Sequence, residues 1–275
     1  MNQERSSERE GDGIMNNKNK SLADKIPKRV WLLISFAVAM LFWYILSIIP
    51  STSRAFQNVV VVCQSIKTMI DRGVLGTDIL SSLISVVAGY VLGFVIALPV
   101  AILMAWYKPV RYIIEPWIQF IRNIPPLAYV PLVVISAGVG RRPQVIVIWL
   151  ATFLIMTVTI YQGVRNVDET LIKAAKVLGA KDSDLFVKVI FPATTPFIIT
   201  AVRLGVSVAL TTLIAAESTG AIAGMGMRIR SLNNTFEVEP MLLYIIMIGI
   251  IGITSEKIIK YLERRFTGWQ ETRNV

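Results

Sequence analysis

The sequence predicts an all-α membrane protein, a polytopic bundle of about six transmembrane helices. Hydrophobic residues make up 54% of the 275 residues and charged residues only 17%, which is too apolar for an ordinary water-soluble domain. A helix needs about 20 mostly apolar residues to cross a bilayer. Six stretches come close to this requirement, namely Val30–Ile49, Ile79–Tyr107, Ile124–Gly140, Gln144–Val164, Pro196–Ser218 and Pro240–Ile259.

Lysine and arginine are distributed unevenly around these stretches, which indicates their orientation. The net charge is +10. If the N-terminus lies in the cytoplasm, the cytoplasmic segments carry 18 basic residues and the outer loops carry 7. The positive-inside rule therefore predicts that both termini are cytoplasmic, and it explains the basic character without a nucleic acid as partner. The pair Arg141-Arg142 runs against this rule on the outer side.

Few residues of the chain could support catalysis or bind a metal. The sequence has no histidine, which removes the commonest general base and the commonest metal ligand. Its single cysteine, Cys63, excludes an internal disulfide. Neither an enzyme nor a metal site is predicted. Cys63 shares a helical face with apolar residues, so we expect it to be a small apolar contact beside Phe56, Val59, Ile66 and Ile70.

The chain contains no segment that would form a soluble domain. Residues 1–29 are expected to be a disordered cytoplasmic tail that starts at either Met1 or Met15, residues 30–269 one transmembrane domain, and residues 270–275 a short tail. The first span is too long for a signal-peptide core and is predicted to be an uncleaved anchor. An amphipathic helix along the outer face is expected next, ended by Asp71-Arg72-Gly73. Gly89-x-x-x-Gly93 favours close helix packing inside the bundle over a contact between subunits.

The inner loop, residues 165–195, carries more helix signals than a simple connection needs. Asn166-Val167-Asp168 can cap a helix, Gly179 can end it, and Asp182-Ser183-Asp184 can cap a second helix. The loop is therefore predicted to form a helix, a tight turn and a second helix on the cytoplasmic side. From the residues alone, a docking element for a cytoplasmic partner and a solvated loop between spans are equally good interpretations.

The spacing of this loop resembles the EAA loop of ABC importer permeases. The matching positions are Ala174, Ala175, Gly179 and Pro192, whereas Lys173 stands where the family pattern has an acid. The resemblance extends from about Gly76 to Trp269 and includes Phe120–Ala128, Gly163–Val167 and Tyr261–Arg265. Together these stretches are similar to the nitrate, sulfonate, taurine and bicarbonate branch of the family. Residues 137–141 depart from that branch, since Arg141 occupies the place of an acid.

The resemblance implies the transmembrane permease subunit of a type I ABC importer in the bacterial inner membrane. Two copies would form the pathway, with homodimer and heterodimer both open, and a solute-binding protein would deliver cargo from outside. Two ATPase subunits would hold ATP and Mg, and this chain, which lacks a G-x-x-x-x-G-K-[ST] loop, would need no cofactor. The ATPases would bind the inner loop at Lys173, Ala174, Ala175, Gly179, Ala180 and Asp182.

The branch favours a small anion as cargo, such as a sulfonate, taurine, nitrate or bicarbonate. A heterocyclic vitamin precursor is the alternative cargo for the same machine. A secondary transporter that works alone is the remaining alternative, and it would need ion-coupling carboxylates in mid-membrane, where the sequence places none.

Polar residues of the fifth span fall on one helical face, which makes them candidates for the wall of the pathway. They lie within an arc of roughly 120° at 100° per residue, and they are Thr200, Arg203, Ser207, Thr211, Glu217 and Ser218. Charged groups within a membrane usually face protein or a water-filled cavity. Two other interpretations stay open: Arg203 bonds to carbonyls of a neighbouring helix, and Glu217 caps the loop Gly220–Gly226.

Overall fold

The computed structural model describes residues 27–266, and every regular element in that range is a helix. Contacts divide the chain into two units, one up to Val60 and one from Val61 onward, and each is described by itself. Five helices of the described range are long and apolar enough to cross a membrane, and a bent helix pair would make a sixth. The predicted all-α bundle is therefore confirmed. The predicted tails fall almost wholly outside the described residues.

The first unit consists of one apolar helix and the turns that follow it. Helix α2 spans Lys28–Ile48, close to the predicted first span, and none of its described side chains is buried within the unit. The indole nitrogen of Trp43 donates a hydrogen bond to the carbonyl of Gln57 over 2.9 Å. The Trp43 ring also meets Phe56 edge-on, with the ring centroids 6.3 Å apart. These contacts hold the turns that follow α2 against its last part.

Helix α3, Val59–Asp71, is the amphipathic helix that the sequence predicts before the second span. It ends at Asp71, and the turn that follows contains Gly73, whose φ of +68° favours glycine. The predicted contact of Cys63 is wrong, because the helix buries Val62, Ser65 and Met69. Cys63 follows Val62 directly, so it lies on a different face of the helix, and it is exposed.

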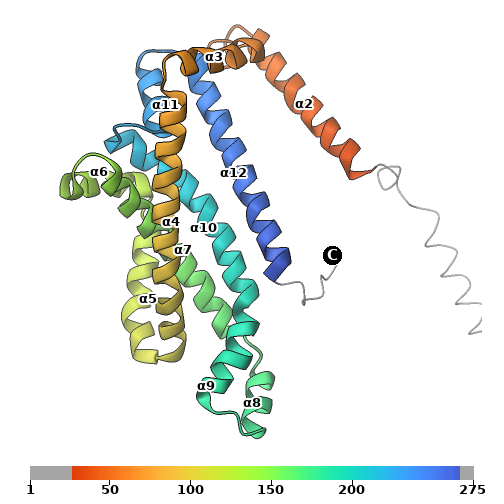
Figure 1. Ribbon diagram of the computed structural model, residues 1–275, viewed down its shortest axis with the longest axis vertical. Coiled ribbons are helices and arrows are strands. Elements are labelled where there is room, and N and C mark those ends of the chain that lie inside the picture. Colours follow the sequence, from red (N-terminus) through yellow and green to blue (C-terminus); the bar gives the residue numbers. More distant parts are fainter. Residues whose placement is uncertain (1–26, 267–275) are drawn as a thin grey trace, which may run out of the picture. The chain divides into compact units, whose positions relative to one another are not determined.

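Three long helices form the centre of the second unit: α4 (Leu75–Trp106), α7 (Arg141–Arg165) and α10 (Phe191–Gly220). Figure 1 shows α7 running beside both α4 and α10, and α7 packs most extensively on these two. Small residues allow the close approach. A Cβ added to Gly89 would lie 2.7 Å from Cβ of Ile148, and one added to Gly93 would overlap Thr152. The predicted role of Gly89-x-x-x-Gly93 in packing within the bundle is confirmed.

The third predicted span is shorter than the sequence indicates and is bent against the helix before it. Residues Lys108–Arg122 form α5 and Pro126–Ala137 form α6, and these two helices are bent by 104°. The predicted span Ile124–Gly140 corresponds to α6 alone, which covers 12 residues and passes as apolar enough for a membrane only together with α5. Pro126 lacks an N–H, and a residue that precedes a proline avoids helical geometry, so the helix cannot continue through Pro125-Pro126.

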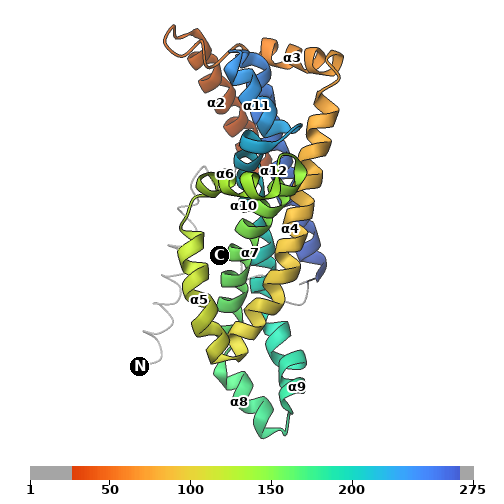
Figure 2. The same cartoon turned by 90° about the vertical axis from the view of Figure 1, so that its left-hand side faces the viewer.

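The remaining helices cap the two ends of the central three. At one end, α8 (Glu169–Val177) and α9 (Asp182–Leu185) form a hairpin, and a π-helical stretch, Phe186–Ile190, leads without a break into α10. At the other end, α11 (Met225–Asn234) follows α10. Helix α12 (Val238–Phe266) then runs back alongside α10. Figure 2 shows the hairpin and α11 at opposite ends of α10. Helix α10 passes through Pro196, where the sequence predicts that the fifth span begins.

Candidate functional site

The hairpin of α8 and α9 is set by local signals at both ends of α8. The Asp168 carboxylate accepts a hydrogen bond of 2.7 Å from the backbone N–H of Thr170, as the predicted cap requires. This bond holds the pKa of Asp168 below its usual value. At the other end, Gly179 takes a φ of +82°. Its N–H bonds to the carbonyl of Lys176 and that of Ala180 bonds to Ala175, which is the Schellman arrangement.

The second helix of the hairpin begins differently from the prediction. Its N-cap is Lys181, whose side chain makes no capping bond, and Asp182 is already helical. The predicted cap by Asp182-Ser183-Asp184 is therefore wrong. The Asp184 carboxylate instead pairs with Lys188 over 2.7 Å, at the i,i+4 spacing of an exposed helical ion pair.

The hairpin is preformed yet leaves an apolar tip in solvent. Its own small core consists of Val167, Leu185 and Ile190. Val177 and Leu178, at the turn, are 88% and 87% exposed. The candidate residues around them are mostly exposed too: Lys173 pairs with Glu169 over 3.1 Å, Ala174, Gly179 and Asp182 are exposed, and Ala175 and Ala180 are half-buried. Such a surface can dock a partner without refolding.

The structure places the hydroxyl residues of the predicted pathway face at the surface of this chain. Thr200, Ser207 and Thr211 are exposed, and Ser218 is half-buried. Thr200 and Thr211 donate to the α10 backbone, to the carbonyls of Pro196 at 2.9 Å and Ser207 at 3.1 Å. Such bonds are the usual role of helix threonines, so these two hydroxyls are already bonded within the helix.

Arg203 does not offer a free charge to a solute. Its guanidinium forms an ion pair with Glu263 of α12, and both side chains are about one-third exposed. The bond ties α10 to α12, so the partner is a carboxylate rather than a carbonyl of a neighbouring helix. The sequence contains Glu263 in the stretch Tyr261–Arg265, but nothing there signals that it reaches Arg203.

Glu217 lies apart from the exposed face and belongs to the cap of α11. Its carboxylate is fully buried and accepts from the Ser82 hydroxyl at 2.7 Å and from the Gly226 N–H at 2.7 Å. The predicted pathway role of Glu217 is not supported, because α4 and the start of α11 cover its carboxylate. The capping interpretation agrees with these bonds.

Asp78 is the buried acid that the sequence reasoning missed. Its carboxylate accepts from Arg228 Nε at 2.7 Å, from the Tyr244 hydroxyl at 2.9 Å and from the Gly224 N–H at 3.1 Å. The hydrogen bond to the Asp78 carboxylate raises the pKa of the Arg228 guanidinium. A lone acid at the start of an apolar span was the available signal.

Two carboxylates and one hydroxyl thus hold three successive backbone N–H groups at the start of α11. Asp78 accepts from Gly224, Ser82 from Met225 at 2.8 Å, and Glu217 from Gly226. A helix N-terminus carries partial positive charge and favours anions. The start of α11 is therefore locked by polar bonds, and the carboxylates of Asp78 and Glu217 are both bonded within the chain.

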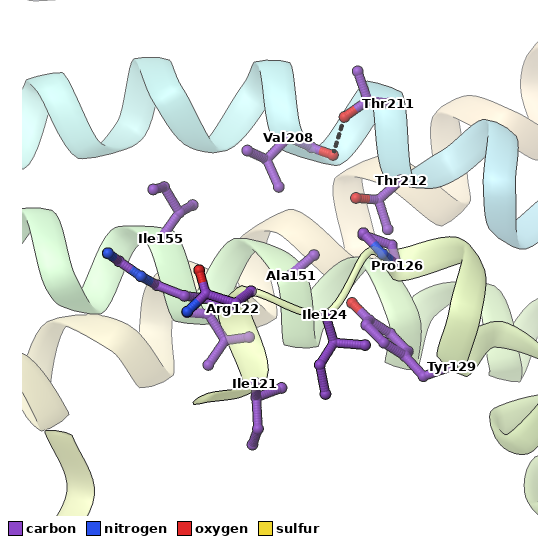
Figure 3. A pocket seen from close by; sticks show the side chains of 12 residues that line it. Ile121, Arg122, Ile124, Pro126, Tyr129, Ala151, Ile155, Val208, Thr211 and Thr212 are labelled. Atoms are coloured by element: carbon purple, nitrogen blue, oxygen red, sulfur yellow. Dashed lines mark hydrogen bonds between the residues drawn. The ribbon is translucent and has the colours of Figure 1, made fainter. Parts of the chain in front are cut away.

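A pocket of about 410 Å³ lies where the third span is broken. Figure 3 shows it between α10 on one side and α5, α6 and α7 on the other. Its walls are mostly aliphatic, and its polar groups come from Arg122, Asn123, Tyr129, Thr211 and Thr212. Of the predicted pathway residues, Thr211 alone lines it. The volume of this pocket lies within the range of small-molecule binding sites.

Comparison with known proteins identifies the family of this architecture. Residues 93–268 match the family model described as the inner membrane component of binding-protein-dependent transport systems. A probable ABC transporter permease of Brucella abortus (strain 2308) is 42% identical over 87% of this chain and 95% of that protein. The taurine transport system permease protein TauC of Escherichia coli (strain K12) is 37% identical over 62% of each chain. A solved amino acid ABC transporter shares the fold, with a TM-score of 0.62 at 18% identity, covering 73% of this chain and 97% of that chain.

Proposed function

Since this chain belongs to the family of binding-protein-dependent transport system inner membrane components, we propose that it forms the pathway of an ATP-driven importer for a small anion. Two copies of the chain would enclose the pathway between them. A solute-binding protein would deliver the anion on the outer side. Two ATPase subunits would dock on the cytoplasmic side and supply the energy, so that rigid-body rocking of packed helices alternates access.

The observation that carries the coupling role is the hairpin of α8 and α9. Its core and caps hold it rigid, while its apolar tip, Val177 and Leu178, remains in solvent. Burying two exposed aliphatic side chains in a partner is favourable. The hairpin also runs directly through Phe186–Ile190 into α10. A displacement of the tip by an ATPase would therefore reach a long helix that lines the pocket.

The support for an anion comes from the relatives and from charge. The taurine permease, a relative over 62% of the chain, is named for an organic sulfonate. Arg122 places a positive charge at the pocket beside the broken span. A positive field at a pathway raises the local concentration of anions.

Docking is tested by replacing Val177 and Leu178 with aspartate and co-purifying the chain with its ATPase. We expect the double variant to lose ATPase from the complex and to lose transport. Phe236→Asp is the matched control, because Phe236 is also 87% exposed but follows α11, far from the hairpin. If the tip variant binds and couples its ATPase as well as the control does, the hairpin is not the docking element.

The cargo class is tested on the solute-binding protein that works with this chain. Its thermal unfolding would be followed with sulfonates, nitrate, bicarbonate and thiamine-like heterocycles. Stabilisation by a sulfonate or an inorganic anion supports the anion importer, because a ligand that binds the folded protein raises its melting temperature. Stabilisation by heterocycles alone overturns the anion assignment and leaves the permease assignment intact.

A further inference from the structure

The pocket at the broken span has walls that suit the apolar part of a cargo. Its aliphatic lining includes Ile121, Ile124, Leu154, Ile155 and Val208. A hydrated inorganic anion gains nothing from such walls, whereas a short carbon chain gains about 25 cal/mol for each Å² removed from water. The lining therefore favours an organic ion over a bare inorganic one.

Arg122 provides a positive charge at this pocket that no carboxylate neutralises. Among the residues that the structure describes, Arg122 takes part in no ion pair, whereas Arg111 pairs with Glu115 at 2.8 Å and Arg228 with Asp78 at 2.7 Å. Arg122 ends α5, inside the broken span. A cation at such a place usually faces a cavity or a pathway. Figure 3 shows its side chain along one end of the pocket.

Thr212 provides a hydroxyl that lacks a bonding partner within the chain. It is 2% exposed, and its Oγ1 has no hydrogen bond, unlike the neighbouring Thr211, which bonds to its own helix. A buried hydroxyl without a partner costs about 1–3 kcal/mol. Figure 3 shows the Thr212 hydroxyl turned toward the pocket, at the end that also holds Pro126 and Tyr129. A ligand with hydrogen-bonding oxygens would satisfy it.

The beginning of α6 adds the positive end of a helix dipole at the Thr212 end. Pro126 is at the first turn of α6 and lines the pocket. Pro125 and Pro126 carry no N–H, and the N–H of Ala128 bonds to the carbonyl of Pro125 at 2.9 Å, so this end attracts an anion through the helix dipole. Helices that are interrupted within a membrane use such ends to bind anionic groups of a substrate.

We propose that this pocket binds a small organic anion with an aliphatic body, such as a short-chain sulfonate, in passage through the permease. The oxyanion lies at the Thr212 hydroxyl and the start of α6, and the carbon chain lies against the aliphatic walls. Arg122 at the other end contributes attraction through its charge. The inference rests on the proposed import of an anion, and it adds the residues that choose among anions.

The test uses the permease–ATPase complex in lipid nanodiscs without the binding protein, with radiolabelled butanesulfonate as the probe. We expect saturable binding, competed by ethanesulfonate and much less by nitrate or by butanol. Thr212→Val should weaken binding about two- to tenfold, because it removes a hydrogen bond to the anion, and Arg122→Gln about two- to fivefold at low salt, because it removes a longer-range attraction. Thr212→Ser and Arg122→Lys should restore most of the affinity.

The salt dependence separates the two roles. Arg122→Gln should flatten the loss of affinity with rising salt, because it removes the charge that salt screens, whereas Thr212→Val should leave that slope unchanged. Thr219→Val and Arg54→Gln are matched controls, since Thr219 bonds to its own helix and Arg54 is exposed in the first unit. ATPase activity of each complex reports whether the variant is folded.

Three results would overturn the proposal. The first is wild-type affinity in both Arg122→Gln and Thr212→Val, and the second is nitrate competing as well as ethanesulfonate. The third is no butanesulfonate binding by the wild-type complex. Uptake of anions by proteoliposomes that contain the binding protein is measured in parallel. If uptake persists, only the pocket assignment fails; if the wild-type complex takes up no anion, the proposed function fails.

Discussion

Replacing Asp78 with asparagine should destabilise the second unit more than any other single change to a polar side chain there. Asp78 is fully buried, and its carboxylate accepts from Arg228, Tyr244 and Gly224 at 2.7, 2.9 and 3.1 Å. Asparagine keeps the size but loses the charge and one acceptor oxygen. The guanidinium of Arg228 is then left partly buried, with only 23% of its side chain exposed, and without its counter-charge.

The magnitude follows from that geometry. Removing one partner of a buried ion pair costs about 3–5 kcal/mol, and the partial exposure of Arg228 reduces this to about 2–4 kcal/mol. For a domain of this size, such a loss lowers the melting temperature by about 5–15 °C. The assay is thermal unfolding of the purified protein in detergent, with Asp71→Asn as the control, because Asp71 is an exposed acid on α3.

A double-variant cycle separates the ion pair from packing. Arg228→Met alone leaves the Asp78 carboxylate buried with fewer donors, so it should also destabilise the protein. The double variant Asp78→Asn/Arg228→Met should be more stable than the sum of the single losses by at least about 1 kcal/mol. The reasoning fails if Asp78→Asn melts with the Asp71→Asn control, or if the two single losses simply add.

The other predictions concern the hairpin and the cap of α11. Gly179→Val should uncouple ATP hydrolysis from transport while Gly179→Asn retains more coupling, because the site is open and only its φ of +82° resists a side chain, which asparagine tolerates better. Gly224→Ala should lower stability by roughly 2–4 kcal/mol in the same unfolding assay, since its φ is +143° and the methyl would lie 2.8 Å from Oε2 of Glu217. Asp168→Ala should weaken ATPase stimulation while Asp168→Asn preserves it, because asparagine can still cap α8. The pKa of Asp168 is lowered in the fold, so this cap stabilises the hairpin at neutral pH and is lost only as the pH falls below the usual aspartate value of about 4.

Each of these has a contradicting result. Equal coupling in Gly179→Val and Gly179→Asn would show that backbone conformation at the tip is unimportant. Wild-type melting of Gly224→Ala would mean that the start of α11 can shift away from the Glu217 carboxylate. Equal ATPase stimulation in the two Asp168 variants at pH 7 would show that the cap does not shape the docking surface.

The hairpin could be predicted because its signals are local. A capping carboxylate at Asp168 and a left-handed glycine at Gly179 act on residues two to four positions away, within one helix turn. A sequence shows such relations directly. The second helix of the hairpin was placed correctly, but its cap was not, because three adjacent polar residues all satisfy the pattern and only backbone geometry selects the first helical position.

The polar residues of α10 could not be assigned from the helix alone. A helical wheel gives the direction of Arg203 and Glu217 but not the neighbour that covers each of them. Arg203 meets Glu263 of α12, 60 residues away, and Glu217 meets Ser82 of α4, 135 residues away. Whether a charge inside a bundle belongs to the scaffold or to a pathway depends on such distant partners, which only the packed structure supplies.

The broken span shows a different kind of failure. Counting apolar residues predicts a span over Ile124–Gly140, although Pro125 and Pro126 stand inside it and separate α5 from α6. Breaking a helix within a membrane frees backbone groups that must be satisfied by protein or water, so a break is retained where it lines a cavity. The pocket at this break also holds the unpaired Arg122 and the unbonded Thr212 hydroxyl. Local rules are usually broken at functional sites. Two of them, an unbroken span and a bonded buried hydroxyl, are broken at this one pocket, which is the physical reason to look for the cargo there.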